Sequence, residues 1–177
     1  EGNCRGADDH HGKEGPHQKG EQMTPRPISH AFLEACEEVQ NTRNDDFNGP
    51  DQEGAGLYQV TQFWSGPRRG ERCSVAAAYL HPVMTRQNLE VITSAHATRV
   101  NFQGRRAASV TYRQGGALKS VSARRELLLC GGAFNSPQLL MLSGIGPGAH
   151  LSSHGIATLH DLPGVGRNLQ DHPAFGV

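Results

Sequence analysis

The stretch Arg125-Glu126-Leu127-Leu128-Leu129-Cys130-Gly131-Gly132 decides which class of fold this sequence suggests. A continuous apolar run after a charged pair is typical of a strand covered on both faces, usually in a parallel sheet. Two glycines end the run, and Ser136-Pro137 follows with the residue types preferred at a helix N-cap and first turn. We therefore expect a central strand at 126–130, a glycine turn and a helix starting at Ser136, an order typical of nucleotide-binding α/β domains.

Upstream of this stretch the sequence changes to short segments rich in β-forming residues. Gly104 and Gly115-Gly116 mark turns between them. This pattern predicts successive strands at 89–94, 98–103, 107–113 and 118–123.

The first 90 residues give weaker signals. Apolar residues at helical spacing predict a helix over 27–39, with Pro27 in its first turn. Residues 57–64 alternate weakly and favour a strand, and residues 74–80 a short helix that ends at His81-Pro82. His10, His11, His17 and His30 lie in or beside a polar, glycine-rich stretch that we interpret as a solvated loop and not as a metal site.

Composition excludes several classes of protein. The 177 residues carry 17 basic and 17 acidic side chains, so net charge gives no electrostatic footprint for nucleic acid or an anionic membrane. No stretch approaches the roughly 20 apolar residues that span a bilayer. The four cysteines have no CxxC spacing, and Cys36 and Cys130 are expected to be buried free thiols. Glu1 and the strand-like residues 174–177 suggest that both ends are cut.

The segment from Gly132 to Gly146 resembles, position by position, the second signature of the glucose-methanol-choline (GMC) oxidoreductase family. That signature fixes Gly, a small residue, Ser, Pro, two aliphatic residues and a closing Ser-Gly-aliphatic-Gly. Further family-like pieces occur in the same order as in the family, at His11–Pro16, Asp46–Gly49, Gln52–Gly54, Arg72–Ser74 and Leu162–Pro173. The similarity covers nearly the whole chain and is strongest to the branch of choline and alcohol dehydrogenases.

The resemblance implies an FAD-binding Rossmann-like α/β domain interleaved with an antiparallel-sheet substrate domain, both incomplete here. Residues 1–71 would be a cap and substrate-domain segment, 72–148 part of the FAD-binding domain, and 149–177 the return connection. The family's dinucleotide fingerprint would precede Glu1, and its catalytic histidine would follow Val177. The missing N- and C-terminal parts would thus be partners of this chain.

The resemblance also implies positions for FAD contacts. Ala97 matches the position whose backbone meets the adenine, although an ordinary strand residue is the alternative. Cys130, Gly131 and Gly132 form a corner that permits close backbone approach to a cofactor, or else only a tight turn. Asn168 and Asp171 would anchor a loop beneath the flavin. We assign no catalytic and no metal-binding residue, and we interpret His172 as part of that supporting loop.

The expected activity is oxidation of the CH–OH group of a primary alcohol, choline or an aliphatic or aromatic alcohol, by hydride transfer to flavin. The electron acceptor is unknown, and no nucleic acid is expected as a partner. The expected location is the cytoplasm, with peripheral membrane association left open. The alternative is a non-catalytic fragment that has only partial competence for cofactor binding or assembly.

Overall fold

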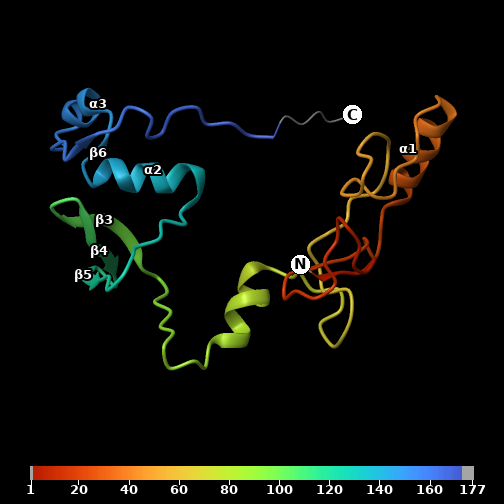
Figure 1. Cartoon of the computed structure of the whole chain (residues 1–177), viewed down its shortest axis with the longest axis horizontal. Helices are drawn as coiled ribbons and strands as arrows, with labels where there is room; N and C mark the ends of the chain where they lie inside the picture. The colour runs from red at the N-terminus through yellow and green to blue at the C-terminus, as the bar shows by residue number, and fades with distance from the viewer. Residues whose placement is uncertain (1, 173–177) are drawn as a thin grey trace. The chain divides into compact units, whose positions relative to one another are not determined.

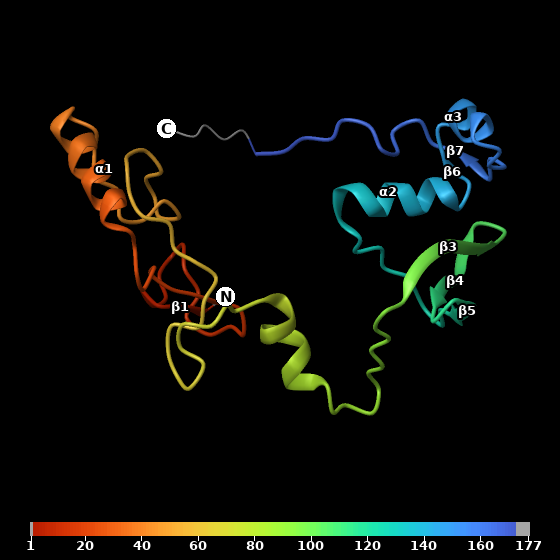
Figure 2. The same cartoon turned by 180° about the vertical axis from the view of Figure 1, so that it is seen from behind.

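The computed structural model of the chain describes residues 2–172. The chain divides into two compact units, Glu1–Glu90 (the N-terminal unit) and Val91–Val177 (the C-terminal unit), which Figures 1 and 2 show from two sides. The expected division into 1–71, 72–148 and 149–177 concerns a larger enzyme and stays a prediction. The strand expected to open at 174–177 lies outside the described residues.

A three-stranded antiparallel sheet forms one layer of the C-terminal unit. Its strands are β3 (His96–Gln103), β4 (Arg106–Gln114) and β5 (Ala117–Ser122), paired in that order. Three of the four strands predicted upstream of residue 125 are thereby confirmed. Both connections use glycine in the left-handed region, with φ of 58° at Gly104 and 56° at Gly115.

Helix α2 (Gly132–Leu142) packs on the sheet next to β3. The contact is tight: Val100 of β3 is 2% exposed, and its N–H donates to Ser143 Oγ at 2.8 Å. After Gly144, whose φ is +89°, the chain adds β6 (Ile145–Gly146), α3 (Gly148–Ser153) and β7 (His160–Asp161). Strands β6 and β7 pair in parallel.

The central strand predicted at 126–130 does not form. These residues run without a strand partner among the described residues, and Leu128 is 74% exposed. The strand predicted at 89–94 is also wrong, because Ser94 adopts a left-handed conformation (φ 53°) and no described strand pairs with the segment. Its hydrogen bonds include one from Gln114 Nε2 to the Thr93 carbonyl. β-forming side chains give a strand only where a neighbouring strand satisfies the backbone.

Helix α2 starts five residues earlier than predicted, since its N-cap is Gly131 and not Ser136. Gly131 is its N-cap, so Pro137 lies inside the helix and not in its first turn. Ser136 lies inside the helix, and its Oγ accepts a hydrogen bond from the Gly131 N–H at 3.0 Å. The predicted end of the helix at Ser143-Gly144 is confirmed.

The N-terminal unit consists mainly of loops. It contains a short parallel pair, β1 (Gly2–Asn3) and β2 (Gln18–Lys19), and helix α1 (Pro27–Glu38), which confirms the helix predicted over 27–39. The helix predicted at 74–80 forms a π-helical turn, η1 (Ala76–Leu80), followed by the 3₁₀ turn η2 (His81–Val83). The strand predicted at 57–64 is wrong, because this segment makes only isolated bridges, Gly20 with Val60 and Gln62 with Arg72.

The two thiols expected to be buried are not. Cys36 is half-buried on α1, and Cys130 is exposed because no strand covers its segment. Cys73 is the buried cysteine of the described chain, with its sulfur accepting from the Gln18 N–H at 3.2 Å. Within residues 2–172, no helix is both long and apolar enough to cross a bilayer.

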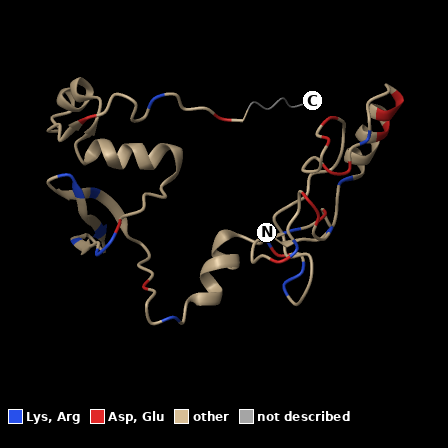
Figure 3. Ribbon diagram, in the orientation of Figure 1, with Lys and Arg blue, Asp and Glu red and all other residues tan. Residues whose placement is uncertain are grey.

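Charged side chains are distributed unevenly between the two units (Figure 3). Of the 17 acidic residues, 14 belong to the N-terminal unit and three to the C-terminal unit, whereas the 17 basic residues divide into nine and eight. The zero net charge of the whole chain is therefore the sum of a net negative N-terminal unit and a net positive C-terminal unit.

Candidate cofactor site and a buried polar network

One cavity brings together two of the positions at which the sequence predicted cofactor contacts. It has a volume of about 520 Å³ and lies within the C-terminal unit, between the sheet and α2. Ala97 of β3 and the corner residues Cys130 and Gly131 both line it, although more than 30 residues separate them in sequence. The remaining wall includes Val110, Leu129, Asn135 and Leu139. The cavity is thus largely apolar, with backbone and amide groups at its edges.

Backbone conformation favours glycine at Gly132, and the space around Gly131 is tight. A Cβ at Gly131 would meet the Asn135 Cβ at 3.1 Å and the Ser136 nitrogen at 3.2 Å. Gly132 has a φ of +80°, in the region that side chains with a Cβ rarely adopt. Both features keep the backbone open where the extended segment turns into α2, although Gly132 itself does not line the cavity.

Asn168 and Asp171 lie elsewhere. Asn168 lines a second cavity, of about 380 Å³, which Ala133 and Pro137 border on a different face of α2. Its φ of 56° marks a sharp turn of the loop. Asp171 lines neither cavity, and its carboxylate accepts the backbone N–H of the next residue, His172. Ala97, Cys130 and Gly131 therefore line one cavity together, whereas Asn168 and Asp171 do not line it.

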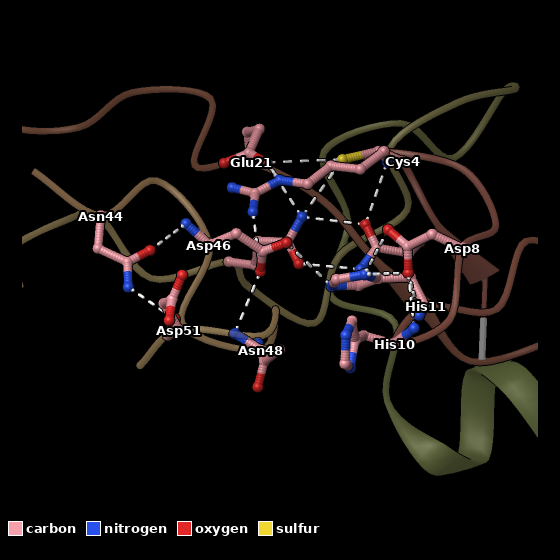
Figure 4. A network of polar contacts seen from close by, with 12 residues as sticks. Cys4, Asp8, His10, His11, Glu21, Asn44, Asp46, Asn48 and Asp51 are labelled. Atoms are coloured by element: carbon pink, nitrogen blue, oxygen red, sulfur yellow. Dashed lines mark hydrogen bonds and ion pairs between the residues drawn. The ribbon is translucent and has the colours of Figure 1, made fainter. Parts of the chain in front are cut away.

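A polar network around the buried side chain of His11 connects loops of the N-terminal unit (Figure 4). His11 is at its centre, with a side chain only 1% exposed. Its Nδ1 hydrogen-bonds Asp8 Oδ1 at 2.9 Å, and its Nε2 lies 3.3 Å from Asp46 Oδ2, close enough to form an ion pair but without hydrogen-bond alignment. Both ring nitrogens therefore face carboxylates.

Arg5 extends the network on the other side of Asp46. Its guanidinium pairs with Asp46 Oδ1 at 3.0 Å and with Glu21 Oε1 at 2.8 Å. Gln59 donates to Glu21 Oε1 at 3.0 Å and exchanges amide hydrogen bonds with Asn3, which is 1% exposed. The network thus ties together segments that lie up to 56 residues apart.

The network shifts the pKa of two of its members. The hydrogen bond to Asp8 raises the pKa of His11 above its ordinary 6.5, with a further contribution from the charge of Asp46 and an opposing one from burial. The pKa of Asp8 falls below 3.8, chiefly because its carboxylate accepts the His10 backbone N–H and then the His11 ring. The geometry therefore favours an imidazolium between two carboxylates.

The sequence indicated His11 and Asp46 separately and did not predict that their side chains meet. His11 and Asp46 each begin a stretch that resembles the GMC family, but no spacing rule predicts that residues 35 positions apart will meet. The walls of the 520 Å³ cavity were missed for the same reason. The predicted place of Ser136 at the N-cap is wrong, because Ser136 lies inside α2, where its Oγ accepts a hydrogen bond from the Gly131 N–H.

The fold and the cavity define part of a mixed α/β domain with a cavity of about 520 Å³ beside a glycine corner. The sequence pattern of the GMC oxidoreductase family matches residues 17–174. The chain therefore belongs to the GMC oxidoreductase family.

Curated relatives agree with this assignment. The chain is 47% identical to "Alcohol dehydrogenase [acceptor]" of Pseudomonas putida, over 92% of this chain and 29% of that protein. It is 42% identical to "Oxygen-dependent choline dehydrogenase" of Sinorhizobium fredii, over 96% of this chain and 30% of that protein. The chain thus spans about 30% of the length of these relatives.

Solved structures confirm the expected α/β fold class. The chain superposes on pyridoxine 4-oxidase from Mesorbium loti with a TM-score of 0.79 and 29% identity, covering 91% of this chain and 31% of that one. A formate oxidase gives a TM-score of 0.73 at 26% identity, over 85% of this chain and 26% of that one.

Proposed function

We propose that this sequence is part of an FAD-dependent oxidoreductase that oxidises the CH–OH group of a primary alcohol. The observation that carries the proposal is the family match over residues 17–174, together with relatives named alcohol dehydrogenase and choline dehydrogenase. A solved relative from Chaetomium thermophilum is described as an FAD-dependent oxidoreductase, which supports FAD as the cofactor.

The cavity beside α2 fits part of such a cofactor. Ligand cavities commonly have volumes of about 300–1,000 Å³ and mainly apolar walls with a few polar groups. The 520 Å³ cavity has this character and suits an aromatic base better than a phosphate, because no Lys, Arg or His side chain other than His96 lines it. We assign it to the adenine end of FAD.

Each predicted contact then has a physical role. Ala97 presents backbone and a small side chain to the base, and Val110 across the sheet adds an apolar wall. The Cys130–Gly132 corner allows the cofactor to approach the backbone closely. We propose that Asn168, which lines the second cavity bordered by α2, and Asp171, three residues further along the chain, support a loop nearer the flavin.

When bound, the flavin would accept a hydride from the alcohol carbon, while a base takes the hydroxyl proton and a carbonyl product forms. We assign that base to none of residues 1–177. His172 is exposed, and its backbone N–H donates to the Asp171 carboxylate, which suits the supporting loop that we propose.

The substrate class that we propose is a small alcohol, choline or an aliphatic or aromatic primary alcohol, as the names of the relatives suggest. The electron acceptor that we propose is oxygen or a quinone-type molecule. We place the enzyme in the cytoplasm, with attachment to the membrane surface as the alternative location.

A second candidate concerns the 177-residue chain taken by itself. The uncovered Leu128 and the open segment 126–130 favour a piece with only partial competence for binding FAD or for assembly with the rest of the enzyme. Expressed alone, it should retain little flavin through gel filtration. Stoichiometric yellow flavin bound to the isolated chain would exclude this candidate.

The main proposal is tested on the full-length protein. Purified protein should carry flavin, and adding choline or a primary alcohol without oxygen should bleach the flavin absorbance. A full-length protein that binds FAD but is not reduced by any alcohol would refute the substrate class, and one that binds no flavin would refute the cofactor as well.

A further inference from the structure

Two histidines of the C-terminal unit lie against each other and have no part in the proposed oxidation. They are His150, on helix α3, and His154, the residue that caps the C-terminus of that helix. Their ring centroids are 4.7 Å apart, and the ring planes meet at 76°. Both residues are exposed, and neither ring forms a hydrogen bond or an ion pair with any residue of 2–172. Two imidazoles without another polar partner therefore share one patch of surface.

The sequence places the two rings on the same side of α3. Residues four apart are neighbours on a helix surface, with Cβ atoms about 5–6 Å apart. Leu151, 1% exposed, anchors the helix in the core of the unit. The Gly148 N–H donates to Asp161 Oδ1 at 2.8 Å, which ties the start of α3 to strand β7 (Figure 2). The helix is therefore held from beneath, while the histidines His150 and His154 remain in solvent.

Hydrogen bonds also fix the backbone at the histidines themselves. Ser153 Oγ donates to the His150 carbonyl at 2.8 Å, and the His154 N–H donates to the Leu151 carbonyl at 3.1 Å. The Ile156 N–H returns to the same Leu151 carbonyl at 2.9 Å, which closes the turn after the helix. Only the side-chain torsions of the two histidines are left free, so the pair is nearly preorganised for a shared ligand.

We infer that His150 and His154 together bind a divalent transition-metal ion. Imidazole nitrogen suits Zn²⁺, Cu²⁺ and Ni²⁺, and two histidines at positions i and i+4 of a helix can bind one ion. With a metal–nitrogen bond of about 2.0–2.1 Å, each ring centre lies about 3.2 Å from the ion, and two ligands at about 90–110° have ring centres about 4.5–5.2 Å apart. The observed 4.7 Å lies within this range. Rotation of the rings is therefore enough to form the site.

The histidines of the N-terminal unit do not offer a comparable pair. His11 is engaged by Asp8 and Asp46, and His17 contacts the ring of Tyr79. Within the described residues, no group of three or more His, Cys, Asp and Glu could hold a metal ion. The site on α3 thus supplies two ligands, and water completes the coordination of an exchangeable ion. This inference revises the expectation that the chain has no metal-binding residue.

The metal site is separate from the proposed cofactor site. His150 and His154 line neither the 520 Å³ cavity nor the 380 Å³ cavity. Alcohol oxidation should therefore be the same with and without both histidines. A protein that binds metal at α3 but oxidises no alcohol would refute the proposed function alone, and an active protein that binds no metal there would refute this inference alone.

The test is nickel binding by the full-length protein, prepared without an affinity tag. In equilibrium dialysis, wild-type protein should bind about one Ni²⁺ more than His150→Gln/His154→Gln. Each single variant should weaken binding at this site about tenfold or more, because the remaining imidazole loses the effective concentration of its neighbour. Mg²⁺, which prefers oxygen ligands, should not compete. The control His30→Gln removes an exposed histidine of α1 that has no histidine three or four residues away, and it should bind as much Ni²⁺ as wild type.

A spacing control separates chelation from the mere number of histidines. The double variant Ser152→His/His154→Gln keeps that number but places the two imidazoles two residues apart, where they do not face each other. It should bind Ni²⁺ as weakly as the single variants. Circular dichroism and alcohol oxidation confirm that each variant is folded. The inference is overturned if this spacing variant binds as tightly as wild type, or if His150→Gln/His154→Gln binds as much Ni²⁺ as wild type.

Discussion

At the scale of single residues, the most informative side chain is His11. An imidazole that is 1% exposed and has a carboxylate at each nitrogen is stabilised as the cation. Its neighbour Asp8 is stabilised as the anion by the same contacts and by the His10 backbone N–H. The two groups therefore stabilise each other only where both are charged.

The stability of the N-terminal unit should follow this pair. The His11 contribution is complete below pH 6.5, its ordinary pKa, and is lost as pH rises through its raised folded pKa. The Asp8 contribution is complete above 3.8 and is lost as pH falls through its lowered folded pKa. The Tm of wild type should thus exceed that of His11→Gln by the largest margin between pH 3.8 and pH 6.5, which melting curves recorded across pH can measure.

Exposed neighbours give the controls for this prediction. His10→Gln and Asp9→Asn change residues that lie beside the network with their side chains in solvent. Both should leave the pH profile of Tm unchanged. If His11→Gln differs from wild type by the same amount at acidic and alkaline pH, the residue serves only to fill space.

Ala97 is a second position where a single substitution should change a measurable property, the affinity for FAD. Replacing it by Phe would fill the edge of the 520 Å³ cavity, so Ala97→Phe in the full-length protein should lower FAD affinity about tenfold or more, equal to 1.4 kcal/mol or above. Ala117→Phe, on the exposed strand β5, is the control. Equal flavin content after dialysis in both variants would argue against the adenine assignment.

At the scale of elements, α2 and β3 are joined by one buried hydroxyl. Ser143 is 2% exposed, accepts from the Val100 N–H at 2.8 Å and donates to the Leu139 carbonyl at 2.6 Å. It therefore closes the helix and satisfies a backbone donor of the strand at the same time. Gly144 follows with a φ of +89°, and a Cβ there would approach the Ala157 carbonyl oxygen at 2.7 Å.

Removing this hydroxyl should destabilise the C-terminal unit. Ser143→Ala leaves the Val100 N–H buried and unpaired, which costs about 1–3 kcal/mol. Chemical denaturation should show that loss, while Ser152→Ala on the exposed side of α3 should change stability by less than about 0.5 kcal/mol. A change below 0.5 kcal/mol for Ser143→Ala would mean that water replaces the hydroxyl.

The elements also show which sequence patterns can be trusted. Helix α1 and strands β3 to β5 formed where predicted, because their periodicity and turn glycines are local signals. The predicted strands at 89–94 and 126–130 had the same β-forming residues but no neighbour to pair with among the described residues. Family membership nevertheless stands, since the match over 17–174 does not depend on that strand.

At the scale of the whole molecule, the two units carry opposite net charges, and both expose large apolar side chains. Leu128 and Phe134 are each 74% exposed; Leu128 lies in the unpaired segment 126–130, and Phe134 follows it on α2. An extended apolar segment with free backbone groups is a template for association with another chain. The 177-residue chain in isolation should therefore self-associate through this segment.

Dynamic light scattering can measure this tendency. Leu128→Asp in the 177-residue chain should raise the concentration at which large particles appear, because a charge interrupts the apolar run. Ile28→Asp is the control, since Ile28 is equally exposed, at 72%, but lies on a regular helix whose backbone is paired. Equal improvement by both variants would show that general charge, and not this segment, limits solubility.

The sequence by itself determined the family, the fold class, helix α1, three strands of the sheet and the glycine corner before α2, because these depend on local spacing and on a contiguous signature. Only the tertiary structure decided that His11 meets Asp46 and that Ala97 and Gly131 share one cavity. The reason is physical: local propensity acts over a few residues, whereas burial, ion pairing and strand pairing depend on which distant segments the fold brings together.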